Sequence, residues 1–374
     1  MKKDISSNYN QVRPPITGKI GPRGEFGGEE YIYFAGNNYL DLARRPELIE
    51  GAVEAAKKYG TTFGAGRTTT GTSVIHLELE EKLAEFKGTE AAMIFPSGYL
   101  GNQIILSGLM KQGDTLLCDE LAHPSILEAL PRSKYKVVTF RHNDVNDLRN
   151  KLESKSRGLI LVNGVDPSVG VLAPLDKIEE AAKGGDFRIL VDDAHATGVL
   201  GKNGRGTPEH FGLNSDRIFQ TETMSKALGS YGGFIAGREE FIENLRDVSQ
   251  TYRGSTPLPP AVVGASIAAV EIATEEPELR DRVRSNAKYL SSKLISLNLN
   301  ANWYGSAIIK LDIPEELSKK IYSHLLEKRI MVPYIHYPKL ESPGRLRLTV
   351  SAGHSERNID TLVESITECL EEDQ

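Results

Sequence analysis

Residues 188–195 read RILVDDAH, a short apolar run that ends in two aspartates and a histidine. A continuous apolar run of this length, bounded by polar residues, is typical of a strand that is buried on both faces of a sheet. The polar residues follow the strand directly and therefore lie at its carboxyl end. This stretch predicts a buried strand that delivers carboxylates to one edge of a sheet.

Six further apolar runs share this pattern, and segments with helical periodicity separate most of them. They cover residues 91–98, 115–121, 136–144, 158–165, 217–223 and 232–237. Strands that alternate with helices indicate βαβ units and an α/β fold with a mainly parallel sheet. Because ligands bind beyond the carboxyl ends of the strands in such sheets, we expect the functional residues among the polar residues there.

The first part of the chain divides into an arm and a large domain. Residues 1–45 are polar and rich in glycine and proline at their start, which favours an N-terminal arm. Helical periodicity begins at residues 46–59 and recurs at 76–88. We therefore expect residues 46–260 to form the large α/β domain that carries the functional residues.

The last part of the chain has a different pattern. From Pro260 to about residue 297 the sequence predicts one long helix. Short strands are expected near residues 306–313 and 344–350. Residues 261–374 are thus predicted to form a smaller C-terminal α+β domain.

Composition excludes several classes of protein. The 374 residues carry a formal net charge of -6 and are 39% hydrophobic and 26% charged, as in ordinary globular proteins. No dense basic block suggests nucleic-acid binding, and no apolar run is long enough for a membrane span. Cys118 and Cys369 lack the spacing of a metal site or a disulfide framework. We expect a cytoplasmic protein without a metal.

Lys226 stands among small and hydroxyl residues in residues 221–230, TETMSKALGS. An ordinary solvated lysine has more charges nearby, and this one follows a predicted strand one crossover after Asp192. An acid and a lysine in this arrangement match a pyridoxal phosphate site, which needs an acid at the pyridinium nitrogen and a lysine at the aldehyde. Taken alone, Asp192 also fits a strand-end residue that caps a turn.

A phosphate site is predicted in residues 95–102, FPSGYLGN. Here a strand end is followed by the turn at Ser97 and Gly98 and by a helix start, whose backbone N–H groups bind anions. A plain connection between strand and helix is the alternative. Thr223 and Ser225 lie close to Lys226 in sequence and can add hydroxyl donors.

Together these motifs resemble the α-oxoamine synthase family of fold-type I pyridoxal phosphate enzymes. The motifs are NNYLDLA (37–43), SGYLGN (97–102), RHNDV (141–145), VDDAHATGVLGKNGRGT (191–207), TMSKALGSYGG (223–233) and GRLRLTVSAGHS (344–355). The resemblance covers about Phe34 to Leu370. It implies a mainly parallel seven-stranded sheet sandwiched by helices, and an enzyme that condenses an amino acid with an acyl-CoA or acyl-carrier thioester. Most members release carbon dioxide and CoA.

The resemblance implies roles for residues around the cofactor. Lys226 matches the Schiff-base lysine, Asp192 the partner of the pyridinium nitrogen, and His195 the residue that faces the ring hydroxyl. His123 matches the histidine that stacks on the cofactor ring, although a lone histidine is more often structural. The phosphate is expected to contact the turn at Ser97, Gly98 and Tyr99, together with Thr223.

Two further matches imply an active site that is shared between subunits. Ser255 and Thr256, in GSTPLPP, match residues that reach the phosphate bound by a neighbouring subunit. We therefore expect a homodimer.

On the substrate side, Arg345 matches the arginine that binds the amino-acid carboxylate, a planar anion that suits a forked guanidinium. Arg347 lies on the same strand face and is the competing candidate. Asn38 matches a polar residue near the substrate.

Residues 162–175, VNGVDPSVGVLAPL, depart from the family pattern TEGVFSMDGDIAPL. Asn163 replaces a glutamate, Pro167 replaces a serine with Ser168 one step later, and valines stand at two aspartate positions. In the family this loop lies beside the cofactor and the substrate. The changes therefore bear on which substrate is used, and Ser168 is the substrate-binding candidate in the loop.

Residues 37–43 and 60–76 most resemble the family branch that condenses L-alanine with a pimeloyl thioester, in the synthesis of biotin. The branch that uses glycine and acetyl-CoA is second, and serine palmitoyl transfer is third. Functions outside this reaction are an aminotransferase or lyase on the same fold, or an inactive partner subunit. A dinucleotide-dependent dehydrogenase is disfavoured, because no GxGxxG motif with a downstream acid follows the first strand.

Overall fold

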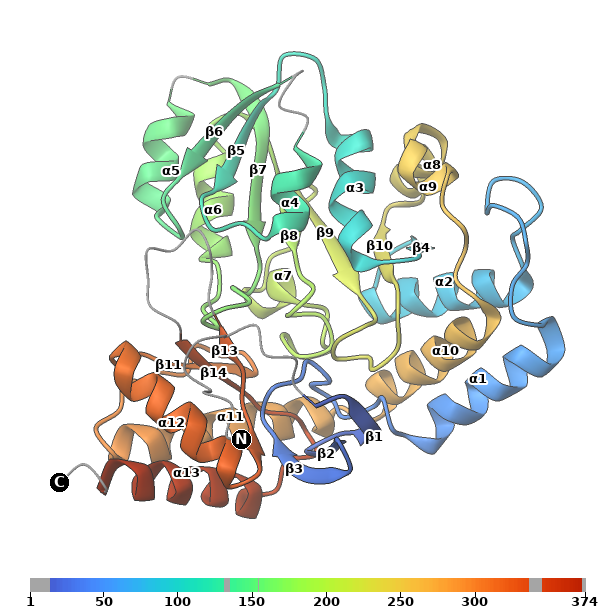
Figure 1. The fold of residues 1–374 in the computed structure, drawn as a ribbon. Coiled ribbons are helices and arrows are strands. Elements are labelled where there is room, and N and C mark those ends of the chain that lie inside the picture. The colour runs from blue at the N-terminus through green and yellow to red at the C-terminus, as the bar shows by residue number, and fades with distance from the viewer. Residues whose placement is uncertain (1–13, 131–134, 154, 336–344, 372–374) are drawn as a thin grey trace.

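The computed structural model describes residues 14–130, 135–153, 155–335 and 345–371, with no description of the Arg345 side chain. Its centre is a seven-stranded sheet in the order β4-β10-β9-β8-β7-β5-β6 (Figure 1). All strands are parallel to their neighbours except β10, which is antiparallel to both β4 and β9. The seven strands expected from the sequence are confirmed. Their bounds are β4 Ala91–Phe95, β5 Thr115–Asp119, β6 Lys136–Phe140, β7 Arg157–Asn163, β8 Asp186–Asp192, β9 Ile218–Thr223 and β10 Gly233–Gly237.

Helices cover both faces of this sheet, which explains why its strands are mainly apolar. In β7, Leu159 and Leu161 pack into one core cluster, while Ile160 and Val162 pack into another on the opposite face. The first face is covered by α3, α4 and α8, and the second by α5 and α6. These helices span Gly101–Leu109, Pro124–Ala129, Glu239–Val248, Val145–Leu152 and Leu175–Ala182, in that order; the short α7 and α9 span Thr207–His210 and Gln250–Arg253.

Three more helices cover the β4–β10 end of the second face: α1 (Pro46–Tyr59), α2 (Val74–Lys87) and α10 (Pro260–Glu275). The helices α1 and α10 meet at Gly51 and Gly264. A Cβ atom added at Gly51 would lie 2.7 Å from the Gly264 carbonyl oxygen, so only glycine allows this contact. The helix α10 thus packs with the core of the large part of the molecule.

The single long helix expected after Pro260 is wrong. The helix α10 ends at Glu275, and a second helix, α11 (Glu278–Ser296), begins after Glu276 and Pro277. Proline disfavours helical backbone in the preceding residue, and Glu276 has φ -110° and ψ 67°.

The smaller part of the molecule has its own core, formed by α11, α12 (Glu315–Glu327), α13 (Glu356–Glu371) and a three-stranded sheet. The sheet has the order β11-β14-β13, and its strands are Ile308–Leu311, Arg345–Thr349 and Tyr334–Ile335. No helix in the described ranges is long and apolar enough to cross a membrane.

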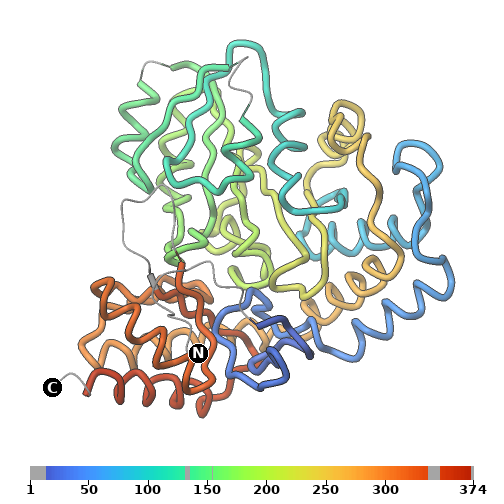
Figure 2. The backbone as a smooth tube through the Cα atoms, in the orientation of Figure 1, coloured from blue at the N-terminus to red at the C-terminus, as the bar shows by residue number. Residues whose placement is uncertain are grey.

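The end of the segment expected as an N-terminal arm forms strands instead. Strands β1 (Ile16–Ile20), β2 (Arg23–Phe26) and β3 (Glu29–Tyr33) build a sheet with β12 (Ile330–Met331). Figure 2 shows this early segment beside the C-terminal part of the chain. Ile32 and Phe34 are buried in the core of the smaller part, which fixes the segment there. The domain boundaries stay a prediction, although the packing joins the early strands to the smaller part.

A buried layer of charge lies under the strand ends. Lys87, at the end of α2, pairs with Glu222 in β9, and both side chains are almost fully buried. Burial raises the pKa of Glu222 to about 7, and the charge of Lys87 opposes that rise. Asp193 lies next to this pair and accepts hydrogen bonds from Thr207 and Gln220. This layer holds the ends of β8 and β9.

We expect Lys87→Met to destabilise the fold because it leaves the Glu222 carboxylate buried without a cation. Removing one partner of a buried pair costs about 3–5 kcal/mol. In a Glu222→Gln background the same change should cost much less, because no carboxylate then remains buried without a cation. Chemical denaturation of the four proteins of this cycle measures the coupling, and equal losses in both backgrounds would contradict the interpretation.

Candidate active site

The strand ends border a cavity of about 210 Å³. Its walls come mainly from the segments that follow β4, β7, β8 and β9, as expected for an α/β sheet. Eight predicted site residues line it together: Ser97, Gly98, Tyr99, His123, Asp192, His195, Thr223 and Lys226. The remaining lining residues are Ser125, Asn163, Val165, Pro167, Ala194 and Ser225.

Lys226 is a partly enclosed amine in this cavity. The pKa of Lys226 is lowered to about 8: desolvation by the surrounding walls is the largest cause, the carboxylate of Asp192 opposes it, and the positive charge of Arg347 adds to the lowering. Near neutral pH a useful fraction of the amine is therefore unprotonated, which suits a nucleophile and a base.

Asp192 is held by neutral donors. The Nδ2 of Asn102 donates to its Oδ2 at 2.9 Å, and the backbone N–H of Ala194 donates to Oδ1 at 3.2 Å. Thr221 donates to the Asn102 oxygen at 3.0 Å and so orients that amide. No lysine or arginine in the described ranges is ion-paired with Asp192, which leaves the carboxylate available for a cationic ligand atom.

His123 has a fixed ring. Its Nδ1 accepts the backbone N–H of Ser125 at 3.2 Å and lies 2.7 Å from the Ser125 hydroxyl. The side chain of Asn163 accepts the His123 backbone N–H at 3.0 Å and donates to the Leu121 carbonyl. The asparagine at this divergent position therefore supports the ring expected to stack on the cofactor.

His195 is buried and its Nδ1 lies 2.6 Å from the hydroxyl of Tyr39. Burial lowers the pKa of His195 well below its usual range, and the charges of Lys226 and Arg347 act in the same direction. The imidazole is thus neutral and donates or accepts a hydrogen bond without carrying charge.

The turn after β4 forms a close backbone cradle. A Cβ atom at Gly98 would lie 2.8 Å from the Cβ of Thr223, so a larger residue would fill the space. Thr223 and Ser225 hydroxyls lie 2.7 Å apart beside it. Tyr99 contributes backbone here, while its hydroxyl bonds to Glu128, which raises the pKa of Tyr99 to about 12.

The smaller part of the molecule supplies Arg347, which lies in β14 and is almost fully buried. Its Nη1 donates to the Pro167 carbonyl at 2.8 Å, and its Nη2 donates to Asn37 at 3.0 Å. Its Nε has no hydrogen-bond partner in the described ranges. The influence of Arg347 on the pKa of Lys226 places this competing arginine close to the site, whereas the Arg345 side chain lies outside the described part.

Four predicted residues do not line the cavity of this chain. Asn38 accepts the backbone N–H groups of Leu42 and Ala43 and so stabilises a turn. The Ser168 hydroxyl donates to Asp166, and Pro167 faces the cavity in its place. Ser255 and Thr256 follow α9, away from the lining residues.

Sequence reasoning did not single out Asn102, Asn37 and Tyr39. All three belong to the motifs SGYLGN and NNYLDLA, next to residues that were singled out. Their roles depend on which neighbours they meet across the fold, so the motifs marked the segments but not these side chains.

The residues present fit pyridoxal phosphate. The Gly98 cradle suits its phosphate, Lys226 its aldehyde and Asp192 its cationic ring nitrogen. The neutral imidazole of His123 gives a flat contact for the ring.

The cofactor-free protein should react with pyridoxal phosphate faster as the pH rises through about 8, the pKa of Lys226. Arg347→Gln removes a nearby positive charge and should move this midpoint to higher pH, while Asp192→Asn should move it lower. Stopped-flow absorbance measures the rate of imine formation. Arg23→Gln changes a surface arginine and is the control; an equal shift in that variant would contradict the assignment.

Known proteins of similar sequence show which family the chain belongs to. The model of the family described as aminotransferase class I and II matches residues 29–366. An 8-amino-7-oxononanoate synthase 1 of Bacillus velezensis is 39% identical, over 99% of this chain and 96% of its own length. An enzyme of the same name from Bacillus subtilis is 36% identical, over 94% of this chain and 91% of its own length.

Solved structures of similar fold lead to the same family. A serine palmitoyltransferase with bound pyridoxal phosphate superposes with a TM-score of 0.90 and 29% identity, covering 96% of this chain and 92% of that chain. The 8-amino-7-oxononanoate synthase of Francisella tularensis superposes with a TM-score of 0.79 and 25% identity, covering 92% of this chain and 98% of that chain. The fold, the family resemblance and the cofactor expected from the sequence are confirmed: the chain belongs to the aminotransferase class I and II family and, within it, to the pyridoxal phosphate-dependent α-oxoamine synthases.

Proposed function

We propose that this enzyme condenses L-alanine with a pimeloyl thioester, releasing carbon dioxide and the thiol carrier, as an 8-amino-7-oxononanoate synthase. The observation that carries the proposal is the shared cavity of Lys226 and Asp192 with Arg347 at its border, in a chain whose relatives at 36–39% identity bear that name. It would serve the synthesis of biotin.

Bound pyridoxal phosphate supplies an electrophilic aldehyde and a conjugated ring that takes up negative charge from the substrate Cα. Lys226 holds the aldehyde between turnovers, and its free amine, with a pKa of about 8, removes the Cα proton. Asp192 keeps the ring nitrogen protonated, because Asn102 and Ala194 fix its carboxylate without neutralising it. His195 stays neutral and offers a hydrogen bond to the ring hydroxyl.

Arg347 is the residue that we propose for the substrate carboxylate. Its guanidinium has a fixed plane, since Asn37 and the Pro167 carbonyl anchor two of its nitrogens. A planar carboxylate pairs with such a fork and is thereby oriented for loss as carbon dioxide. Desolvation is the main cause of the low pKa of Lys226, and the charge of Arg347 adds to it, so one charge serves both binding and proton transfer.

Serine palmitoyl transfer is the second candidate. Serine palmitoyltransferases superpose on this chain with a TM-score of 0.90, above the 0.79 of the Francisella tularensis enzyme. The Bacillus 8-amino-7-oxononanoate synthases are 36–39% identical to this chain, against 28–29% for the serine palmitoyltransferases and 25% for the Francisella tularensis enzyme. We give identity more weight for the choice of substrate, because fold is shared by enzymes of different specificity. Glycine with acetyl-CoA ranks between the two, as the sequence suggested.

The holoenzyme should respond to L-alanine more strongly than to glycine or L-serine. Visible absorbance follows the binding of each amino acid, and a thiol assay then follows release of CoA from pimeloyl-, acetyl- and palmitoyl-CoA. Lys226→Ala is the inactive control. Release of CoA with L-serine and palmitoyl-CoA alone would establish the second candidate, and keto-acid formation without CoA release would indicate an aminotransferase.

We also propose a homodimer, in the cytoplasm, with an active site completed by the neighbouring subunit. Ser255 and Thr256 lie outside the cavity of their own chain, and Thr256 is exposed. Leu258, two residues after Thr256, contacts His76 and Gly232. Next to these two residues in sequence stand Leu77 and Tyr231, whose apolar side chains are 52% and 54% exposed. Such a surface favours burial against a second copy.

Mixing two inactive variants tests the shared site. Lys226→Ala lacks the amine, and the double variant Ser255→Ala, Thr256→Ala should hold the cofactor weakly. A mixed dimer contains one site that combines an intact Lys226 with intact hydroxyls from the neighbour, so mixing after mild dissociation should restore activity. A monomeric mass for the active enzyme, or a mixture that stays inactive, would contradict the proposal.

A further inference from the structure

The loop between β7 and α6 folds around the side chain of Asp166. This buried carboxylate accepts the backbone N–H of Ser168 at 2.7 Å and that of Val169 at 3.0 Å through its Oδ1 atom, together with the Ser168 hydroxyl. Pro167 lies inside the turn that these bonds close. The position of Asp166 therefore sets the position of the Pro167 carbonyl.

Arg347 depends on this turn for one of its two anchors. The Pro167 carbonyl accepts from Nη1 at 2.8 Å, and Asn37 accepts from Nη2 at 3.0 Å. A displacement of the turn would free one side of the guanidinium and allow its plane to rotate.

His142 lies on the other side of Asp166. Its Nε2 is 3.6 Å from the second oxygen of Asp166, and its Nδ1 is 2.9 Å from the Oδ1 atom of Asp119. Both carboxylates are buried, and no lysine or arginine in the described ranges pairs with either. Buried carboxylates need a nearby cation or hydrogen-bond donor. Only the protonated form of His142 has an N–H group for each of the two carboxylates, Asp119 and Asp166.

The other groups around His142 also favour its protonated form. Burial lowers the pKa of His142, but the hydrogen bond and charge of Asp119, then the charges of Asp166 and Glu120, outweigh burial and raise it above its usual value. The neighbouring Arg141 is occupied by Asp144 at 2.8 Å. The side-chain nitrogen of Asn143 lies 3.1 Å from Nε2, and a protonated Nε2 has no lone pair to accept its N–H. The protonated form therefore requires the Asn143 amide to turn its oxygen toward Nε2.

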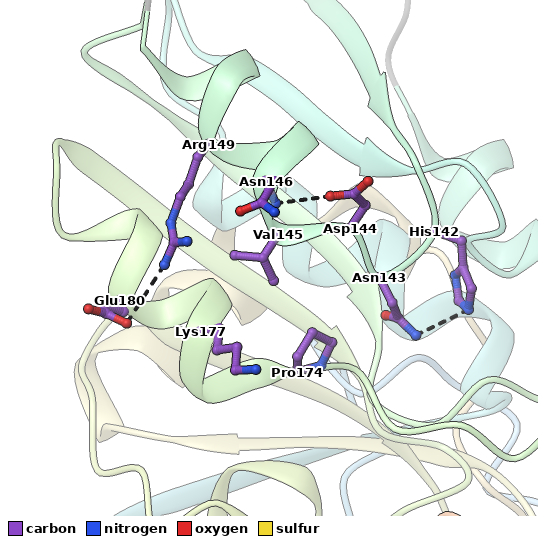
Figure 3. A pocket seen from close by; sticks show the side chains of 9 residues that line it. All are labelled: His142, Asn143, Asp144, Val145, Asn146, Arg149, Pro174, Lys177 and Glu180. Atoms are coloured by element: carbon purple, nitrogen blue, oxygen red, sulfur yellow. Dashed lines mark hydrogen bonds and ion pairs between the residues drawn. The ribbon is translucent and has the colours of Figure 1, made fainter.

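Solvent reaches this histidine from an open hollow of about 670 Å³, which His142 lines together with Arg149, Lys177 and Glu180 (Figure 3). The His142 side chain is 24% exposed, so its protonation follows the pH of the solution. The hollow itself mixes charges of both signs, with Arg149 facing Glu180 at 3.8 Å, and favours no single class of ligand.

We propose that His142 is a positioning residue for amino-acid binding, which holds Asp166 and through the Pro167 turn fixes the plane of Arg347. The inference rests on the proposed function in taking Arg347 as the ligand of the substrate carboxylate. The link is present while His142 is protonated and is lost as the pH rises through its raised pKa. Asp119 anchors the histidine to the end of β5.

The first test is hydrogen exchange of the Ser168 and Val169 amides in the cofactor-free protein, which needs no substrate. His142→Gln should speed their exchange relative to wild type, and the difference should shrink above the pKa of His142. His210→Gln, a change of an exposed histidine on α7, is the control. Wild-type protection in His142→Gln would overturn the proposal.

The second test is kinetic. In His142→Gln the KM for the amino acid should rise about tenfold, roughly the effect of losing one half-buried ion pair, while kcat and the KM for the thioester change little. Asp166→Asn keeps an oxygen for the turn and removes the charge, so the double variant should recover most of the lost affinity. A double variant as weak as His142→Gln would overturn the role of this charge pair.

The two tests separate the two proposals. Faster amide exchange in His142→Gln, in an enzyme that binds no amino acid through Arg347, would refute the proposed function and leave the link between His142 and the turn intact. Unchanged exchange with normal turnover would refute the role of His142 alone.

Discussion

The site depends on keeping an amine and a carboxylate in one desolvated cavity without joining them in an ion pair. Desolvation pushes the pKa of Lys226 down, Arg347 pushes in the same direction, and Asp192 pushes it up, with a result of about 8. A direct ion pair would stabilise the ammonium and remove the base. The structure instead satisfies Asp192 with the neutral donors Asn102 and Ala194, so its charge stays available for a cationic ring nitrogen.

This arrangement explains why the surroundings are polar but mostly uncharged. Ser125, Asn163 and Thr221 orient His123 and Asn102 by hydrogen bonds, and none of them adds a charge that would shift the pKa of Lys226. Charges are placed one layer deeper, where Lys87 pairs with Glu222 and Asp193 is fully enclosed. The strand ends between the two layers fix the positions of the cavity side chains, while the buried charges stay one layer away from Lys226.

The sequence was sufficient to predict features that repeat along the chain, and residues whose surroundings are unusual for their type. Seven apolar runs predicted the sheet, and the lysine among small residues predicted the reactive amine. The sequence was insufficient where the position of a side chain in the fold decides its role. Arg345 and Arg347 are predicted on one strand face, and only the structure shows that Arg347 lies near Lys226. Turns have no period, so nothing in NNYLDLA separated Asn38 from Asn37. The break at Pro277 was visible in the sequence, but the apolar helical pattern on both sides concealed it.

The divergent loop shows how a site can change its side chains and keep its geometry. Asn163 still supports the backbone of His123 although it carries no charge, and Asp166 closes the turn from within. Valines stand at two positions where the family pattern has aspartates, which removes negative charge from the loop that carries Pro167. Within the described part of the chain the Nε of Arg347 has no hydrogen-bond partner, and the Pro167 carbonyl anchors its Nη1, which fits the carboxylate ligand that we propose for this arginine.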